Sequence, residues 1–363
     1  MRHSIVLTFL ILIIAISAGL LAQPFPAGNA EWWNIPYPQT FDPATLKNSM
    51  SFIHVQGNTF VNDQGKVIIF KGVNISDPDK LKKNGTWSNA HFAVIKNWGA
   101  NIVRVPVHPI AWRQSGAGEY LKLLDQAVQW ADELNLYLII DWHSIGNLDQ
   151  GLFQHPMYDT NKQEIYNFWR QIASRYRNIP TIAFYEIFNE PTIWSGQLGN
   201  MSWAQWKTIN QEIIQIIFAF DKKVIPLVAG FNWAYELPEV KDDPIGIPGI
   251  AYVSHPYPQK VTPPWEEKWE RDFGYVADTY PLFATEFGFM AEEDPGAHIP
   301  VIGDEQYGEA LMRYFQKKGI SWTAWCFDPD WSPQLISDWD YTPTQQGQFF
   351  RKWLPDYGNR LQQ

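Results

Sequence analysis

Short apolar runs alternate with stretches of helical periodicity along most of this sequence, and this alternation restricts the fold more than any other feature. Eight runs stand out, at residues 67–74, 101–107, 137–143, 182–190, 224–230, 250–257, 282–288 and 321–327. Between them lie amphipathic segments long enough for crossover helices, among them residues 119–134, 161–176, 202–220 and 304–317. Strands that are apolar on both faces and separated by helices indicate a parallel sheet covered by helices. Eight such units that close on themselves make an α/β fold of the (β/α)8 or TIM-barrel type.

A doubly wound open sheet is the competing architecture. It is less favoured because no glycine-rich phosphate turn follows the first strand. A turn sequence at residues 62–65 (NDQG) predicts a β-hairpin before that strand, which could plug one end of the barrel. We therefore expect a single catalytic domain at residues 51–363, preceded by an irregular leader at residues 23–50 that is rich in Pro, Asn and aromatic residues.

Residues 1–22 have the pattern of an export signal peptide. A short basic start at Arg2 and His3 precedes a long apolar run and small residues before Gln23. We expect cleavage near Gln23 and a secreted protein, extracellular or periplasmic. The apolar run approaches the ~20 residues that span a bilayer, so an uncleaved membrane anchor is the alternative.

Composition narrows the class of partner. With 28 basic and 38 acidic residues the formal charge is −10, which argues against nucleic acid or an anionic membrane. Aromatic residues make up 16% of the chain, and its 19 Trp exceed what the packing of a core of this size needs. We therefore expect many of them to line a surface groove. Nothing in the sequence implies a protein partner, and a monomer is expected.

Polar residues gather at the C-terminal ends of the predicted strands. They are Asn74, Arg104, Asp141, His143, Asn189, Glu190, His255, Tyr257 and Glu286. In a barrel these ends share the face on which such enzymes carry their chemistry. An unpaired buried ion costs several kcal/mol, so the arrangement requires either mutual pairing or a function.

Glu190 and Glu286 are the most informative pair, because they end the fourth and seventh runs and would face each other across a closed barrel. Cleavage of a glycosidic bond requires two opposed carboxyl groups. One gives its proton to the leaving oxygen, and the other attacks or stabilises an oxocarbenium-like transition state. This chemistry needs no metal and no other cofactor.

The motifs around this pair resemble those of glycoside hydrolase family 5, the cellulase A family of retaining barrel glycosidases. "IFNEP" contains Asn189 and Glu190, and "ATEFG" contains Glu286. The resemblance extends from about residue 52 to 353 and includes Arg104 in "IVRVPV", His143 in "IIDWH", His255 and Tyr257 in "SHPY", and Trp325 in "WTAWCF". An "NEP" tripeptide alone is weak evidence, but eight ordered matches at strand ends are strong.

The resemblance implies a role for each matching residue. Glu190 would be the acid/base, with its pKa raised by the neighbouring charge, and Glu286 the nucleophile, kept ionised by donors around it. Asn189 would donate to the 2-hydroxyl of the reacting sugar. Arg104 and Tyr257 would hydrogen-bond Glu286.

The other matches would contact or position the sugar. His143 and His255 would bind hydroxyl groups or steer the two carboxyl groups, and Trp325 would form a flat floor. Further tryptophans in predicted loops could extend this floor, namely Trp112, Trp142, Trp194, Trp233, Trp265 and Trp331, of which Trp194 and Trp233 are taken as substrate-binding residues. Two other acids receive supporting roles: Glu186 pairs with a basic residue inside the barrel, and Asp141 orients a neighbour.

The resemblance favours an endo-β-1,4-glucanase that acts on β-glucan by double displacement. A β-mannanase, xyloglucanase or β-1,3-glucanase of the same family is the nearest alternative, because the shared residues do not separate these substrates. A metal-dependent hydrolase using Asp141, His143, His255 and Glu286 is less favoured, because no paired-histidine motif is present. A non-catalytic sugar-binding barrel is less favoured because both glutamates are retained.

Overall fold

The computed structural model describes residues 31–193 and 195–355 and divides the chain into two units, Met1–Pro36 and Tyr37–Gln363. In the first unit, the described residues form one turn of 3-10 helix, η1 (Trp32–Asn34). The expected signal peptide or anchor at residues 1–22 lies outside the described residues. Within the described part of the chain, no helix has the length and hydropathy required to cross a membrane.

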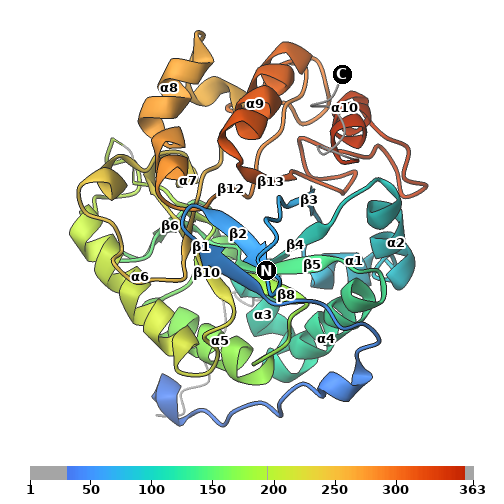
Figure 1. Cartoon of the computed structure of the whole chain (residues 1–363), viewed down its shortest axis with the longest axis vertical. Coiled ribbons are helices and arrows are strands. Elements are labelled where there is room, and N and C mark those ends of the chain that lie inside the picture. Colours follow the sequence, from blue (N-terminus) through green and yellow to red (C-terminus); the bar gives the residue numbers. More distant parts are fainter. Residues whose placement is uncertain (1–30, 194, 356–363) are drawn as a thin grey trace, which may run out of the picture. The chain divides into compact units, whose positions relative to one another are not determined.

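Eight parallel strands of the second unit close into a barrel, which confirms the predicted fold and excludes the open sheet (Figure 1). In ring order these are β3 (Lys71–Asn74), β4 (Ile102–Val107), β5 (Tyr137–Trp142), β8 (Ile182–Glu186), β10 (Ile225–Ala229), β11 (Ala251–Val253), β12 (Leu282–Ala284) and β13 (Ser321–Ala324). The ring closes where β13 pairs with β3, with Trp322 opposite Lys71. The strands are buried on both faces almost throughout, which explains their mainly apolar sequences.

Amphipathic helices surround the ring. The longer ones are α2 (Asn89–Asn97), α4 (Ala117–Glu133), α5 (Lys162–Arg175), α6 (Trp203–Phe218), α8 (Trp265–Asp272), α9 (Glu305–Lys318) and α10 (Gln345–Trp353). The shorter ones are α1 (Pro78–Lys83), α3 (Pro109–Ser115) and α7 (Phe231–Ala234), with 3-10 turns η2 (Pro43–Thr45), η3 (Pro156–Tyr158), η4 (Pro238–Lys241), η5 (Pro258–Lys260) and η6 (Gly274–Asp278). The four helices predicted from periodicity are α4, α5, α6 and α9. Side chains cap the N-termini of α5, α6 and α9, and α4 follows Gly116. Ser202 and Gln205, for example, form a reciprocal capping box at α6.

An antiparallel hairpin, β1 (Ile53–Gln56) and β2 (Thr59–Asn62), covers the N-terminal end of the barrel (Figure 1). Phe60 from β2 packs edge-on against Phe70 and Phe184, with ring centroids 5.8 and 5.0 Å away. The predicted plug is therefore confirmed. Its turn lies at residues 57–58, where Gly57 has a φ of 61°. The predicted turn at 62–65 instead reverses the chain a second time, so the first barrel strand begins at Lys71 and not at residue 67.

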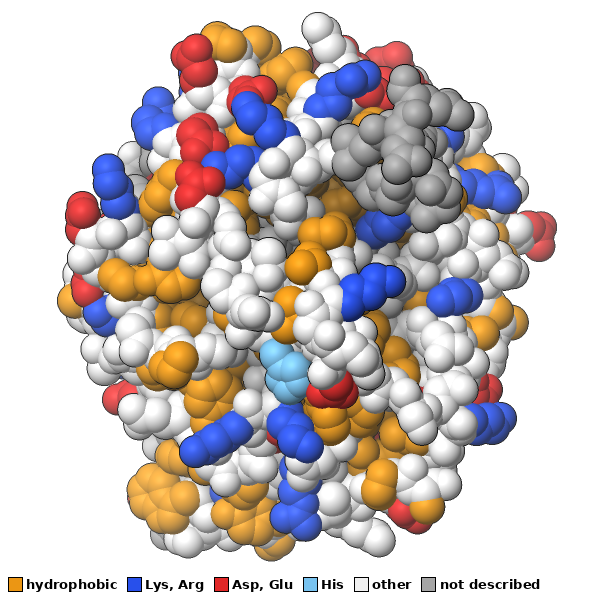
Figure 2. Space-filling model, viewed as in Figure 1, with side chains coloured by type: hydrophobic (Ala, Val, Ile, Leu, Met, Phe, Trp, Pro, Cys, Tyr) orange, Lys and Arg blue, Asp and Glu red, His pale blue; other side chains and the backbone are white. Residues whose placement is uncertain are grey.

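Figure 2 shows basic, acidic and hydrophobic side chains distributed over the face that carries this hairpin. Three further short strands lie near the C-terminal ends of the barrel strands: β6 (Ile145–Asn147), β7 (Leu152–Phe153) and β9 (Glu190–Pro191). The pairing of Ile145 with Glu190 ties the loop after β5 to the loop after β8. This end of the barrel therefore has the more elaborate loops, and it holds the polar residues described next.

Candidate active site

Arg104 is the centre of a polar layer inside the barrel. Its side chain comes from β4, has no exposed surface, and forms two parallel hydrogen bonds to Glu186 at 2.7 and 3.0 Å. The same guanidinium donates to Asn74 Oδ1 at 2.8 Å, to Asn189 Oδ1 at 2.6 Å and to Glu286 Oε2 at 3.3 Å. The predicted pairing of Glu186 with a basic residue in the barrel interior is confirmed. Arg104 thereby fixes both the Asn189 amide and one oxygen of Glu286.

The acids around Arg104 play supporting roles. Burial raises the pKa of Glu186, but Arg104 and His255 outweigh burial and bring that pKa below its ordinary value. Asp141 lies 3.0 Å from Arg104 and 2.7 Å from Nδ1 of His143. The prediction that Asp141 orients a neighbour is therefore confirmed. Both acids are fully buried and do not line the cleft.

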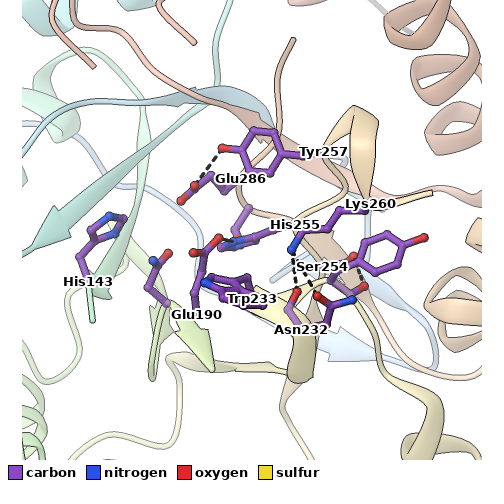
Figure 3. Close-up of polar contacts among 12 residues, drawn as sticks. His143, Glu190, Asn232, Trp233, Ser254, His255, Tyr257, Lys260 and Glu286 are labelled. Carbon is purple, nitrogen blue, oxygen red and sulfur yellow. Dashed lines mark hydrogen bonds and ion pairs between the residues drawn. The ribbon is translucent and has the colours of Figure 1, made fainter. Parts of the chain in front are cut away.

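Glu190 and Glu286 meet at the C-terminal end of the barrel, in the positions expected from the sequence. Glu190 follows β8, Glu286 follows β12, and each retains 7% of its surface exposed. One carboxyl oxygen of each lies within 4.8 Å of the other. Figure 3 shows the two side chains directed toward the same space. The closed barrel therefore brings together two acids that are separated by almost a hundred residues.

Glu286 is held by two donors, as predicted. The Tyr257 hydroxyl donates to Oε1 at 2.9 Å, and Arg104 donates to Oε2. Burial nevertheless raises the pKa of Glu286 to about 7, with a further contribution from the Glu190 charge, against the lowering effects of His255, Arg104 and Tyr257. Burial therefore has a larger effect on this pKa than the donors, which act in the direction that favours the Glu286 carboxylate.

His255 steers the carboxyl groups and does not line the cleft. Its Nδ1 lies 3.0 Å from Glu190 Oε1, and its Nε2 lies 3.0 Å from the Thr285 hydroxyl. Burial alone would lower the pKa of His255, but Glu286, Glu186 and Glu190 outweigh burial and raise it to about 9. The imidazolium therefore donates through both nitrogens. The Thr285 hydroxyl in turn donates a hydrogen bond to Glu186 Oε1 at 3.0 Å. Thr285 was missed from the sequence because a threonine inside a strand end carries no distinctive signal.

Glu190, His255 and Glu286 also place three potential metal-ligand atoms within 4.8 Å of one another. This set differs from the one considered above, because Asp141 and His143 do not belong to it. The two nitrogens of His255 are engaged by Glu190 and Thr285, and its raised pKa keeps it protonated. A protonated imidazole cannot ligate a cation, so these side chains favour proton chemistry over metal binding.

Trp325 and His143 form a stacked pair at the cleft. Their ring planes differ by 5° and the ring centroids lie 5.4 Å apart. Burial, together with His108 and Arg104, lowers the pKa of His143 well below its ordinary value, so the ring is neutral. Trp331 lies parallel to Trp325, with centroids 5.9 Å apart. Trp325 and His143 line the cleft, where an indole face is of the kind that a sugar ring packs on, whereas Trp331 does not line it.

Asn189 offers a donor beside this surface. Its Oδ1 accepts from Arg104, while its buried Nδ2 has no hydrogen-bond partner among the described residues. A buried amide without a partner costs free energy, and such a group at a polar site indicates that a ligand completes it.

The cleft has a volume of about 820 Å³. Six predicted site residues line it: His143, Glu190, Trp233, Tyr257, Glu286 and Trp325. Arg104, Asn189 and His255 lie behind that surface, and Trp194 falls outside the described residues. Of the tryptophans considered as extensions of the floor, three are wrong: Trp112 and Trp142 are core residues, and Trp265 packs on Trp269 and Tyr307.

Several lining residues escaped the sequence analysis, including Gln154, Tyr158, Asn232 and Lys260. They come from loops after the third, fifth and sixth barrel strands. The available signal was their location in loops that follow the C-terminal ends of barrel strands, because such loops form the working face of a barrel. Loop residues have no periodicity, however, and the sequence does not reveal which of them turn inward.

Comparison with known proteins agrees with this geometry. Residues 61–330 match the family model described as Cellulase (glycosyl hydrolase family 5). An endoglucanase from Paenibacillus polymyxa is 23% identical, with the match covering 83% of this chain and 86% of the relative. An endoglucanase from Clostridium saccharobutylicum is 26% identical over 75% of this chain, which spans only 56% of that relative.

Solved structures add a more similar protein. The crystal structure of a beta-glucanase from Saccharophagus degradans is 51% identical, with a TM-score of 0.86 and coverage of 89% of this chain and 98% of that one. The same beta-glucanase has been crystallised in complex with cellotetraose. The catalytic domain of the major endoglucanase from Xanthomonas campestris is 21% identical with a TM-score of 0.66, covers 84% of this chain and 99% of that one, and shows the fold alone.

Proposed function

Because the chain belongs to glycosyl hydrolase family 5, we propose that this glycoside hydrolase cleaves β-linked glucan with retention of anomeric configuration. Glu286 is the nucleophile in this proposal and Glu190 is the acid/base. The observation that carries it is the approach of their carboxyl oxygens to within 4.8 Å. Retaining enzymes hold the two groups about 5–5.5 Å apart, whereas inverting enzymes need about 6.5–9.5 Å to admit a water molecule.

The contacts of the two glutamates support this division of roles. Tyr257 and Arg104 donate to both oxygens of Glu286 and stabilise the carboxylate that attacks C1 of the sugar. His255 donates to Oε1 of Glu190, which leaves the other oxygen to carry the proton for the leaving group. Water then attacks the glycosyl ester of Glu286, with Glu190 taking its proton. Asn189 Nδ2 is available for the 2-hydroxyl, and Trp325 for the sugar face.

β-1,4-glucan cut at internal bonds is the proposed substrate. Its support is the endoglucanase description of the curated relatives and the cellotetraose bound by the Saccharophagus beta-glucanase. β-Mannan, xyloglucan and β-1,3-glucan are the alternatives, and a parallel assay on soluble forms of all four distinguishes them. We further propose that the enzyme is exported and monomeric. N-terminal sequencing of protein from the medium and light scattering of the purified enzyme test these two points.

The decisive experiment is azide rescue of alanine variants on an aryl β-cellobioside. Glu286→Ala should be inactive and regain turnover with azide, giving the α-glycosyl azide, because azide attacks where the nucleophile stood. Glu190→Ala should give the β-glycosyl azide from a glycosyl-enzyme intermediate. Glu267→Ala, an exposed acid on α8, is the matched control and should behave as wild type. Unimpaired turnover by Glu286→Ala would refute the assignment, and loss of wild-type activity on exhaustive chelation would favour the metal alternative.

A further inference from the structure

A second cavity lies on the outer wall of the barrel and shares no lining residue with the catalytic cleft. Its volume is about 350 Å³. Its walls come from the end of α1, the loop that follows, and the first half of α4, on one side of the barrel (Figure 1). The lining residues include Lys82, Gly85, Trp87, Glu119, Lys122 and Gln126. None of them has a part in the function described so far.

Trp87 is a partly exposed aromatic residue in this cavity, and three neighbours hold its ring in place. Its Nε1 donates to Gln126 Oε1 at 2.9 Å. Its ring packs edge-on against Phe92, with centroids 5.6 Å apart, and at a tilt against Trp130, with centroids 5.1 Å apart. A ring that is already fixed loses little conformational freedom when a ligand binds, which favours affinity.

The loop that carries Trp87 is closed on the end of α1. The backbone amides of Thr86 and Trp87 donate to the Leu81 carbonyl, at 2.9 and 3.2 Å. Gly85 turns the chain with a φ of 74°, a conformation that favours glycine. A Cβ atom at Gly85 would meet no atom beyond its chain neighbours within 4 Å, so the space beside this turn is open. The cavity wall is therefore both ordered and accessible.

Polar side chains around the Trp87 ring supply donors and acceptors. Lys122 Nζ lies 2.6 Å from Glu119 Oε1 on α4, and Lys82 adds a second exposed ammonium group. Gln126 uses its oxygen for Trp87, and its NH2 group carries two further donors. An indole face beside closely spaced ammonium, carboxylate and amide groups suits a sugar, whose C–H face packs on the ring while its hydroxyls take the hydrogen bonds. The Glu119 carboxylate disfavours an anion at the same place.

Helix α1 links this cavity to the region beside the catalytic floor. Lys80 precedes Lys82 by two residues and therefore projects from a helix face about 200° away. Its ammonium donates to both oxygens of Asp328 at 2.6 Å and lies 4.9 Å from the Trp331 ring centroid. Trp331 in turn lies parallel to Trp325 of the cleft. The cavity and the loop that carries the floor thus contact different faces of one short helix.

We propose that this cavity is a second carbohydrate site, at which Trp87 packs against a glucose residue of a β-glucan chain while Gln126 and Lys122 bind its hydroxyls. The site holds polymer at the surface of the enzyme and takes no part in bond cleavage. This inference rests on the function proposed above, because the polymer that occupies the site is the proposed substrate.

Affinity electrophoresis in gels that contain hydroxyethylcellulose, a soluble β-1,4-glucan, tests the site on the intact enzyme. The reacting position is first blocked with a 2-deoxy-2-fluorocellobiosyl group, whose attachment to Glu286 is verified by mass spectrometry. Because the label is the same in every variant, a difference in retardation reports binding outside the blocked position. Loss of an aromatic contact corresponds to about a tenfold change in affinity. The association constant of labelled Trp87→Ala should therefore be about tenfold below that of labelled wild type.

Two further variants accompany Trp87→Ala. Gln126→Ala removes the partner of the indole and should weaken retardation in the same direction, so it serves as a second variant if Trp87→Ala does not fold. Gln129→Ala, on the next turn of α4 and outside the cavity, is the matched control and should behave as wild type. Without the label, Trp87→Ala should lose about threefold to tenfold in kcat/KM on hydroxyethylcellulose and nothing on an aryl β-cellobioside.

Equal retardation of labelled wild type, Trp87→Ala and Gln126→Ala overturns the second site. An equal fall in kcat/KM on the polymer and the aryl substrate would also overturn it, because Trp87 would then only support the fold. A loss of retardation in gels of dextran sulfate but not of hydroxyethylcellulose would indicate a polyanion site and overturn the sugar assignment. Activity retained by Glu286→Ala would instead overturn the proposed function, so the two failures are distinguishable.

Discussion

Replacement of Glu286 by glutamine should stabilise the fold at alkaline pH and not at acidic pH. Burial raises the pKa of this carboxyl group from 4.5 to about 7, so the folded protein binds its proton more tightly than the unfolded chain does. Below pH ~4.5 both states are protonated and the group has no linked effect. As pH rises through about 7, the folded state must hold a charge that its surroundings disfavour, and stability falls.

The size of this effect follows from the shift. A displacement of about 2.5 pKa units corresponds to about 3 kcal/mol at 1.36 kcal/mol per unit, fully present above pH ~8. Glutamine imitates the protonated carboxyl group and removes this cost, while its oxygen still accepts a hydrogen bond. For a chain of this length, about 3 kcal/mol corresponds to a rise in Tm of about 5 °C.

Thermal unfolding of wild type and Glu286→Gln, followed by circular dichroism at pH 4 and pH 8, measures this difference. The Tm of Glu286→Gln should exceed the Tm of wild type by more at pH 8 than at pH 4. Glu267→Gln, on the exposed face of α8, should show no such change and controls for loss of a surface charge. A Tm difference that is equal at both pH values, or larger at pH 4, would refute the reasoning that burial dominates at Glu286.

Three further perturbations test the same structure. Tyr257→Phe removes the donor 2.9 Å from Glu286, so the acid limb of the pH profile of kcat/KM should move up by about 1 to 2 pH units. Tyr314→Phe, which removes a hydrogen bond to Glu270, should leave the limb in place. An unmoved limb in Tyr257→Phe contradicts the role of Tyr257 as a donor to the Glu286 carboxylate. Arg104→Met leaves Glu186 and its neighbours without their buried counter-ion and should cost about 3–5 kcal/mol in urea denaturation, and a near-wild-type midpoint contradicts this. Phe60→Ala opens the plugged end of the barrel and should cost about 3–5 kcal/mol with little change in KM; a selective rise in KM would contradict a purely structural plug.

The active-site pair illustrates what sequence reasoning can and cannot supply. The order of Asn189, Glu190 and Glu286 at strand ends is a one-dimensional pattern, and a barrel converts it into proximity. The pKa of Glu286 could not be predicted in this way, because it depends on burial and on His255, Glu190, Arg104 and Tyr257, which come from distant parts of the chain. The pKa of Glu286 is raised because desolvation outweighs the donors around it.

The tryptophans illustrate the same limit at the level of packing. Trp142 and Trp325 both stand at or just past the end of a barrel strand, yet Trp142 is fully buried in the core and Trp325 lines the cleft. The expectation from composition that many tryptophans line a groove is wrong, because among the described tryptophans only Trp233 and Trp325 line the cleft and most of the others pack in the core. The orientation of each side chain depends on the path of its loop. Lys260 carries no motif, and only its approach to Asn232 and Trp233 reveals its position.

By itself, the sequence determined the eight barrel strands, four of the seven longer helices, the presence of a hairpin before the barrel and the identities of the acids at the barrel mouth. These follow from local periodicity and strand-end polarity, because the polarity of each residue reflects whether that position is buried. The tertiary structure alone decided how closely the two carboxyl groups approach, which histidine is charged, and which loop residues complete the cleft. Those properties arise from contacts between distant segments whose irregular loops have no repeating pattern for a sequence to display.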